Sequence, residues 1–183
     1  LAAQAALGVL AWVLGSQVML VANPVASLLL PVLWFMAIVN GINLLDNSDG
    51  LAGGTVLVSA LGASFVAVIF GQALVALMGF ALVGACAGFL VHNWYPARVY
   101  MGDAGAYFLG FLLATLVLRL GTDGVPPLAG AAVSVLLVLL PVVDTLYVVV
   151  SRLRAGVHPF TAGRDHLAHA LQSRGRSVPA SVL

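Results

Sequence analysis

Long apolar runs alternate with short clusters of glycine, proline and polar residues along this chain of 183 residues. A helix needs about 20 apolar residues to cross the hydrocarbon core of a bilayer, and the breaks leave about six segments of that kind. The pattern therefore predicts an all-α, polytopic transmembrane fold. The predicted spans are residues 2–22, 26–45, 51–70, 73–92, 105–120 and 128–150.

The chain changes character after residue 150. Residues 151–183 contain five of the seven arginines, three of the four histidines and no long apolar run. Positively charged segments beside membrane spans usually stay on the cytoplasmic side. We therefore expect a transmembrane domain at residues 1–150 and a cytoplasmic, Arg- and His-rich tail at residues 151–183.

Two polar loops, residues 46–50 and 93–104, interrupt the apolar runs. An even number of predicted spans separates each loop from the tail, so the loops and the tail share one side of the membrane. This holds whatever the absolute orientation of the chain. Polar groups gathered at one membrane face are typical of an active site, and we interpret both segments as cytoplasmic catalytic loops.

Composition excludes a soluble protein. Hydrophobic residues make up 62% of the chain, charged residues make up 7%, and the mean hydropathy is +1.14, whereas roughly 25% of residues are charged in soluble domains. The net charge of +1 says little about partners, and we expect membrane lipid and no nucleic acid. An ionised side chain near hydrocarbon costs several kcal/mol, so the acids should serve a cation, a proton or a polar substrate.

The first polar cluster holds two aspartates three residues apart, Asp46 and Asp49, beside Asn43 and Asn47. Side chains at that spacing point the same way if the helix continues, and like charges so close repel unless a positive group lies between them. A Mg²⁺ ion, a cationic substrate or a proton would each serve. The alternative is that Asp49 only caps the helix that follows.

The second cluster runs from Asn93 to Gly105 and contains one cation, Arg98, and one acid, Asp103. Glycines beside Asp103 allow backbone N–H groups and a phosphate or metal ion to approach closely. The alternative is an interfacial loop with an aromatic belt, in which Arg98 and Asp103 form an ion pair. The residue types leave both interpretations open.

The third cluster contains Arg164, His166 and His169. The histidines share one face of any helix there, near an arginine suited to phosphate. A His pair alone is a weak metal signal, and two solvated histidines are the default alternative. As a functional role we expect His166 or His169 to donate to an anionic oxygen. For Asp144, inside the last predicted span, we expect a structural role as a cap at a kink or as the partner of an arginine.

Two pairs of small residues at helical spacing, Gly50/Gly54 and Gly84/Gly88, suit close helix contacts inside a membrane. Together, the acids, arginines, histidines and glycines at one face predict metal-assisted chemistry on a phosphate-bearing substrate. An ion-coupled transporter is the competing class, but its acids lie near the membrane midplane along a path.

Three segments, in order, resemble the motifs of the polyprenyl-phosphate N-acetylhexosamine-1-phosphate transferases, glycosyltransferase family 4. The segment from Asn43 to Ala52 is similar to the family's Asn-x-x-Asp-Gly-x-Asp-Gly-Leu motif. The segment from Asn93 to Gly105 is similar to its Asn-x-x-Pro-Ala-x-Val-Phe-Met-Gly-Asp-x-Gly motif. Residues 141–146 and 164–171 resemble the C-terminal histidine loop of the branch that uses simple UDP-sugars.

The resemblance implies a Mg²⁺ cofactor, with Mn²⁺ as an alternative, held by Asp103 and Asp46. It implies Asp46, Asp49 and Asp103 as catalytic residues. The residues that it places in substrate binding are Asn43, Asn93, Arg164, His166 and His169.

The implied reaction transfers a sugar-1-phosphate, with UDP-N-acetylglucosamine as the expected donor, to a polyprenyl phosphate such as undecaprenyl phosphate, and releases UMP. It would begin a cell-envelope polysaccharide, as in cell-wall, lipopolysaccharide or teichoic acid synthesis, at the cytoplasmic face of a prokaryotic inner or plasma membrane. The sugar, the lipid length, a homodimer and the role of each aspartate as nucleophile, base or ligand stay open. A non-catalytic transporter or a degenerate scaffold relative is the alternative.

Three departures from the family pattern stand out. Asn47 replaces the usual glycine, Ala168 stands where many relatives have a further histidine, and the family's adjacent Asp pair is absent. The resemblance implies a fold of about ten or eleven spans of about 20 residues each. We therefore expect residues 1–183 to be the carboxyl-terminal part of a longer enzyme, inactive when expressed alone.

Overall fold

The computed structural model describes residues 1–15, 23–120, 124–158 and 166–182. Within these ranges the regular elements are all α-helices, joined by short turns and loops. In chain order they are α1 (Ala2–Val13), α2 (Pro24–Leu45), α3 (Leu51–Ile69), α4 (Ala73–Asn93), α5 (Gly102–Leu120), α6 (Pro127–Leu137), α7 (Leu139–Arg154), α8 (Leu167–Ser173) and α9 (Val178–Val182).

The helices confirm an all-α, multi-pass membrane protein. In the described part of the chain, α2, α3, α4 and α5 are each long and apolar enough to cross a bilayer. Their bounds lie close to four of the predicted spans. The other two predictions differ: α1 ends at Val13, with residues 16–22 outside the described part, and the sixth span is not straight.

The predicted span at residues 128–150 is two helices, α6 and α7, which meet at Val138 at an angle of 62°. Pro141 explains the break, because it has no N–H for the Leu137 carbonyl and its ring would clash with that carbonyl in a continuous helix. The Ser59 hydroxyl on α3 donates to the Leu137 oxygen at 2.6 Å instead. The bend therefore has a hydrogen bond from a neighbouring helix to hold it.

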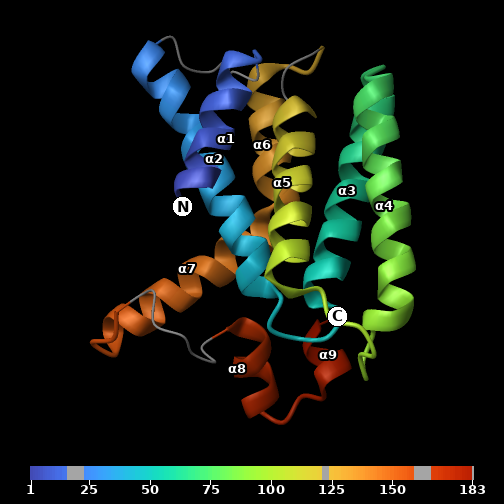
Figure 1. Cartoon of the computed structure of the whole chain (residues 1–183), viewed down its shortest axis with the longest axis vertical. Coiled ribbons are helices and arrows are strands. Elements are labelled where there is room, and N and C mark those ends of the chain that lie inside the picture. Colours follow the sequence, from blue (N-terminus) through green and yellow to red (C-terminus); the bar gives the residue numbers. More distant parts are fainter. Residues whose placement is uncertain (16–22, 121–123, 159–165, 183) are drawn as a thin grey trace.

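The long helices form a bundle in which α2 packs against α1 and α5, and α3 packs against α4 (Figure 1). The α2–α5 contact is close, since a Cβ at Gly110 would lie 2.8 Å from the Val39 Cα. Trp34 Nε1 also donates to the Ala114 oxygen at 3.0 Å. These contacts fix the end of α2 beside the start of α5.

Three of the four glycines singled out in the sequence do not serve helix packing as predicted. Cβ atoms added at Gly54, Gly84 or Gly88 would meet nothing within 4 Å, whereas Gly50 lies against Trp94. Close packing occurs elsewhere, as at Gly110. A glycine spacing alone does not say which helix face meets a neighbour.

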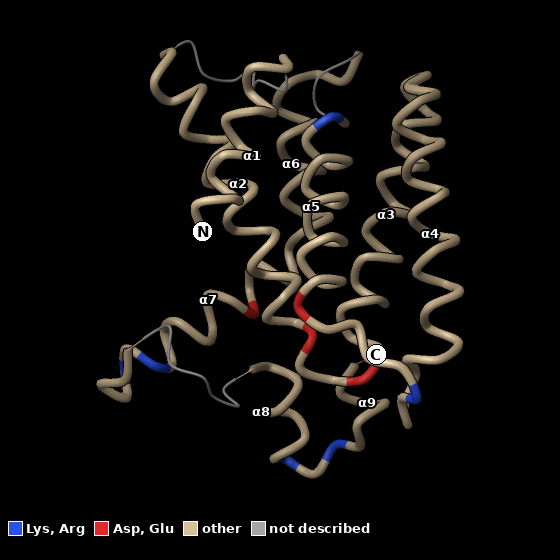
Figure 2. The backbone as a smooth tube through the Cα atoms, viewed as in Figure 1, with Lys and Arg blue, Asp and Glu red and all other residues tan. Residues whose placement is uncertain are grey.

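Charged residues gather at the end of the bundle where α2 passes to α3 and α4 passes to α5 (Figure 2). α7, which turns away from α6, and the short α8 and α9 lie at the same end (Figure 1). At the opposite end the last turn of α5 carries Arg119. The boundary predicted at residue 150 stays a prediction, and α7 continues through it to Arg154.

Candidate active site

The first polar loop begins where α2 stops. Asp46 follows the last helical residue, Leu45, and its N–H bonds to the Asn43 oxygen at 3.2 Å. Gly50 then adopts a φ of 77°, in the left-handed region that favours glycine, and α3 starts at Leu51. The turn places Asp46 at the end of one helix and Asp49 near the start of the next.

Asp46 and Asp103 lie together, although 57 positions separate them in the chain. Asp103 is exposed in the first turn of α5, and its Oδ1 accepts a hydrogen bond of 3.2 Å from Asn43 Nδ2 on α2. The structure thus brings together three predicted site residues from two helices. The prediction that Asp46 and Asp49 lie side by side is not confirmed, because it needed a continuing helix and α2 ends at Leu45. The carboxylate whose charge acts on Asp46 is that of Asp103.

Burial raises the pKa of the half-buried Asp46 above its ordinary value, the Gly102 N–H lowers it, and the charge of Asp103 raises it again. Both raising effects disfavour the ionised form, because burial removes water and Asp103 repels a second negative charge. A cation placed between the two carboxylates would reverse this effect. A cation at this pair stays a prediction.

Asp49 and Asn93 join the two polar loops. Asp49 Oδ2 accepts from the Ala97 N–H at 2.9 Å, and Asn93 Oδ1 accepts from the Gly50 N–H at 3.0 Å. Asn93 is only 4% exposed, and its Nδ2 donates to the Val99 oxygen at 2.9 Å. The substrate roles of Asp49 and Asn93 stay predictions, and their observed contacts hold the loops in register.

Arg98 is exposed at the rim of the second loop. Among the described residues it forms no ion pair with Asp103, which instead contacts Asn43. The predicted ion pair between Arg98 and Asp103 is therefore wrong, whereas the interfacial aromatic belt stays a prediction. Arg98 is placed at the rim of the same end of the bundle as the acids.

The third cluster is only partly described. Arg164 lies outside the described residues, whereas His166 and His169 have ring centroids 6.2 Å apart. His166 is 5% exposed, and its Nδ1 lies 2.8 Å from Oδ2 of the buried Asp144 on α7. His169 is half-buried, and its Nδ1 lies 3.3 Å from Gln172 Oε1.

The hydrogen-bond partners of Asp144 were not predicted from the sequence. The expectation of an arginine partner missed His166, which is 22 positions away along the chain. The expectation of a cap at a kink is not confirmed either: Ser59 bonds to the carbonyl at the bend, while Asp144 Oδ1 accepts from the first N–H of α8, at Leu167, at 2.8 Å. No spacing rule links positions so far apart across a helix and a loop.

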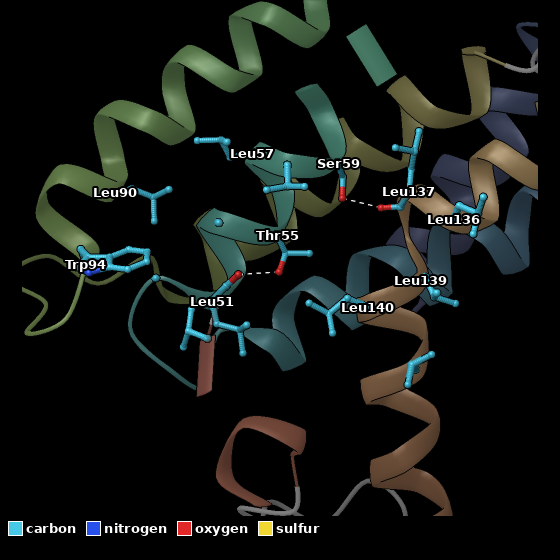
Figure 3. Close-up of a pocket in the computed structure, with 15 residues that line it drawn as sticks. Leu51, Thr55, Leu57, Ser59, Leu90, Trp94, Leu136, Leu137, Leu139 and Leu140 are labelled. Atoms are coloured by element: carbon cyan, nitrogen blue, oxygen red, sulfur yellow. Dashed lines mark hydrogen bonds between the residues drawn. The ribbon is translucent and has the colours of Figure 1, made fainter. Parts of the chain in front are cut away.

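An apolar cavity of about 690 Å³ opens beside the first polar loop (Figure 3). Gly50 and Trp94 line it next to the polar loops, and leucines of α3 and of the α6–α7 bend continue it. Thr55 and Ser59 are its hydroxyl residues, and their hydroxyls bond to the Leu51 and Leu137 carbonyls. The cavity therefore offers an apolar ligand a place to lie next to charged chemistry.

Asp46 and Asp103 offer carboxylate oxygens, the ligand type that Mg²⁺ requires. In the described residues no three acidic, histidine or cysteine side chains cluster as a complete metal cage. Mg²⁺ in phosphate-handling sites is usually held by one or two carboxylates, with waters and substrate phosphates completing the shell. Asp46 and Asp103 fit that requirement, and the repulsion between them gives a reason for a cation.

Residues 2–121 match the family model described as glycosyl transferase family 4. A Bacillus subtilis protein named "Probable undecaprenyl-phosphate N-acetylglucosaminyl 1-phosphate transferase" is 34% identical over 158 residues, covering 84% of this chain and 43% of that protein. Decaprenyl-phosphate N-acetylglucosaminephosphotransferase of Mycolicibacterium smegmatis is 32% identical over 186 residues, covering 90% of this chain and 45% of that protein.

A third relative, phospho-N-acetylmuramoyl-pentapeptide-transferase of Moorella thermoacetica, is 42% identical over 102 residues. That match covers 56% of this chain and 32% of the relative. The chain thus spans less than half the length of each of these curated relatives.

Proposed function

The chain belongs to glycosyl transferase family 4, and from this premise we propose that its protein transfers a sugar-1-phosphate from a UDP-sugar to a polyprenyl phosphate. The donor is UDP-N-acetylglucosamine, in line with the names of the Bacillus and Mycolicibacterium relatives. A phosphate oxygen of the lipid bonds to the sugar-linked phosphorus, the bond from that phosphorus to the UMP oxygen breaks, and UMP leaves. The product is a polyprenyl-diphosphate sugar, the first lipid intermediate of a cell-envelope polysaccharide.

The observation that carries this proposal is the meeting of Asp46 and Asp103 at the end of a membrane bundle. The proposed reaction joins two anions, so the protein must position them and reduce their mutual repulsion. Mg²⁺, when held by Asp46 and Asp103, would supply positive charge to the diphosphate. Asn43 holds Asp103 toward α2 and so keeps the pair together.

The apolar cavity supports a lipid acceptor. It adjoins the polar loops at Gly50 and Trp94 and is lined mainly by leucine and valine side chains of helices that lie within the membrane part. A polyprenyl phosphate has the matching form, an apolar chain that ends in one charged group. We place the chain of the acceptor in this cavity and its phosphate toward Asp46.

The C-terminal histidines are assigned to the diphosphate. His166 and His169 lie near one another under the bundle, at the end that carries the acids. Imidazole N–H groups donate to phosphate oxygens, and Arg164, outside the described residues, is proposed to act with them. The arginines of the C-terminal segment support placing this end on the cytoplasmic side of an inner or plasma membrane.

The test is UMP release by the complete reading frame that contains this chain, purified in detergent with undecaprenyl phosphate, Mg²⁺ and a panel of UDP-sugars. We expect release with UDP-N-acetylglucosamine, loss on addition of EDTA and recovery with excess Mg²⁺. Thr115→Val is the control variant and should release UMP like the wild type, because the Thr115 hydroxyl bonds only to the Phe111 carbonyl of its own helix. Silence with every donor, from folded protein, would favour a non-catalytic membrane protein.

A further inference from the structure

Asp144 is a buried acid next to the candidate site, and the proposed reaction gives it no role. It lies on α7 with 1% of its surface exposed, on the helix side that also buries Pro141 and Val148. A carboxylate so buried is unfavourable unless hydrogen-bond donors satisfy it. The identity of those donors therefore says what the residue does.

Two donors reach Asp144, and both come from the start of α8. The Leu167 N–H donates to Oδ1 at 2.8 Å, and Oδ2 lies 2.8 Å from His166 Nδ1. An ionised carboxylate only accepts hydrogen bonds, so Nδ1 must carry a proton in this arrangement. Nε2 is then the ring nitrogen of His166 left to bind another group.

The Asp144–His166 pair lies close to the acids. α7 crosses α2 at Gly41, where a Cβ would lie 3.1 Å from the Pro141 Cβ and 3.4 Å from the Thr145 hydroxyl. Gly41 lies on the last turns of α2, just before Asn43. The bend between α6 and α7 thus brings Asp144 to the end of the helix that carries the proposed cation site.

We infer that Asp144 is a positioning residue for the transferase: it fixes the ring of His166 with its proton on Nδ1, so that Nε2 meets a phosphate oxygen of the substrate. This inference rests on the proposed function for the phosphate contact. A phosphate oxygen accepts hydrogen bonds, so in the substrate complex Nε2 also carries a proton and donates in a charge-assisted hydrogen bond, with Asp144 as the counter-charge. Asp144 itself touches no substrate.

Asp144→Asn separates this role from a merely structural one. The asparagine oxygen can still accept from the Leu167 N–H, so α8 keeps its cap. The opposite orientation would set the side-chain NH₂ against that N–H, donor to donor. The NH₂ group must therefore face Nδ1, which then loses its proton to Nε2.

The first readout is the protonation of His166 by nitrogen NMR on histidine-labelled full-length protein in detergent, with the signal assigned from His166→Gln. We expect a directly bonded proton on Nδ1 in the wild type and on Nε2 alone in Asp144→Asn. An unprotonated Nδ1 in the wild type would overturn the inference whether or not the protein has transferase activity.

The second readout is kcat/KM for UMP release in a double-mutant cycle. Asp144→Asn should lower kcat/KM by about tenfold or more in the wild type, because a charge-assisted bond is weakened, and far less in the His166→Gln background. Thr145→Val, the next residue on α7, should leave kcat/KM unchanged. If Asp144→Asn does not fold, Asp144→Glu replaces it and should retain more activity than His166→Gln.

The outcomes are distinguishable. An active wild type with an unchanged Asp144→Asn, or with equal losses in both backgrounds, overturns the positioning role and leaves the proposed function standing. A folded wild type that releases no UMP from any donor overturns the proposed function and the phosphate contact. The NMR result then decides on its own whether Asp144 sets the His166 proton.

Discussion

Asp46 and Asp144 lie at the same end of the bundle, yet the protein treats the two acids in opposite ways. Asp46 is half-buried, receives one backbone N–H and lies beside a second acid, Asp103. Asp144 is fully buried and faces two donors from a single neighbouring segment. The first acid is left short of positive charge, whereas the second is satisfied within the fold.

This difference separates residues suited to bind a ligand from residues that stabilise the structure around the site. A cation stabilises an acid pair that has too few hydrogen-bond donors. An acid with donors at both oxygens is not stabilised further by a cation. Substitution of such an acid removes the hydrogen bonds that it already makes. Substitutions at the acid pair should therefore change activity without lowering stability. Removal of the Asp144 carboxylate or of the Asn93 amide should lower stability, in addition to the loss of activity expected for Asp144.

The largest effect is expected for Asp103→Asn. Loss of one of the two proposed cation ligands should lower kcat/KM for UMP release by about a thousandfold or more, corresponding to several kcal/mol of metal assistance. Stability should be unchanged or slightly higher, because the repulsion with Asp46 is removed. Thermal unfolding in detergent checks the second point, and normal turnover by this variant would refute the assignment.

Asp144→Ala should lower the stability of the fold, in contrast to Asp103→Asn. The substitution leaves the His166 Nδ1 and the Leu167 N–H without their acceptor, which should lower the free energy of unfolding by about 2–3 kcal/mol. The measurement is denaturant unfolding in detergent, with Thr145→Val as the neighbouring control. If Asp144→Ala were as stable as the wild type, the contrast between Asp144 and Asp46 would be wrong.

Asn93→Ala should destabilise the protein by about 2 kcal/mol, because the Gly50 N–H and the Val99 carbonyl both lose a buried partner. Asn47→Ala is the matched control, since the Asn47 amide contacts only its own turn. Faster hydrogen exchange at Gly50 in Asn93→Ala would locate the effect. Equal stability of the two variants would mean that Asn93 does not hold the loops.

The smallest expected effect is a pH dependence of Mg²⁺ binding. Because its folded-state pKa is raised, Asp46 keeps a proton in the metal-free protein at pH values where the unfolded chain has lost it. Its contribution to stability is therefore present below the ordinary value of 3.8 and is lost as pH rises through the folded-state pKa. Mg²⁺ needs the carboxylate, so its affinity should rise with pH over that window, by up to about tenfold per pH unit.

Mg²⁺-dependent thermal shifts at a series of pH values measure this dependence. Asp46→Asn should weaken Mg²⁺ binding and flatten the remaining dependence on pH, while Asp144→Asn should leave the profile in place. A wild-type Mg²⁺ affinity that does not change across the window would show that Asp46 is not a ligand.

Much of the fold could be predicted because apolar runs and their breaks are local signals. The bounds of α2, α3 and α4 agree closely with the predicted spans, since polar or glycine residues mark the ends. A kink in the last predicted span was one of two expectations at Asp144, but the division of that span into two helices at Val138 was not predicted, although Pro141 was its signal. A proline can also be tolerated within a membrane span, and its effect depends on what satisfies the freed carbonyl.

The candidate site was predictable as a set of residues and less so as a set of contacts. The even number of crossings was sufficient to expect Asp46 and Asp103 on one face. It could not say that Asp49 would bond to Ala97 or that Asn93 would close on Gly50. Those bonds depend on the shapes of two loops that close against each other.

The sequence by itself determined that this is a membrane protein of several helices whose polar chemistry lies at one end, because hydrophobic length and charge position are properties of the chain. Tertiary structure alone decided which acid meets which partner. Asp46 lies beside Asp103 because α2 packs on α5, and Asp144 meets His166 because α7 turns away at Val138. Hydrogen bonds and charge repulsion act over a few ångströms, so the distance in space, set by helix packing, decides them.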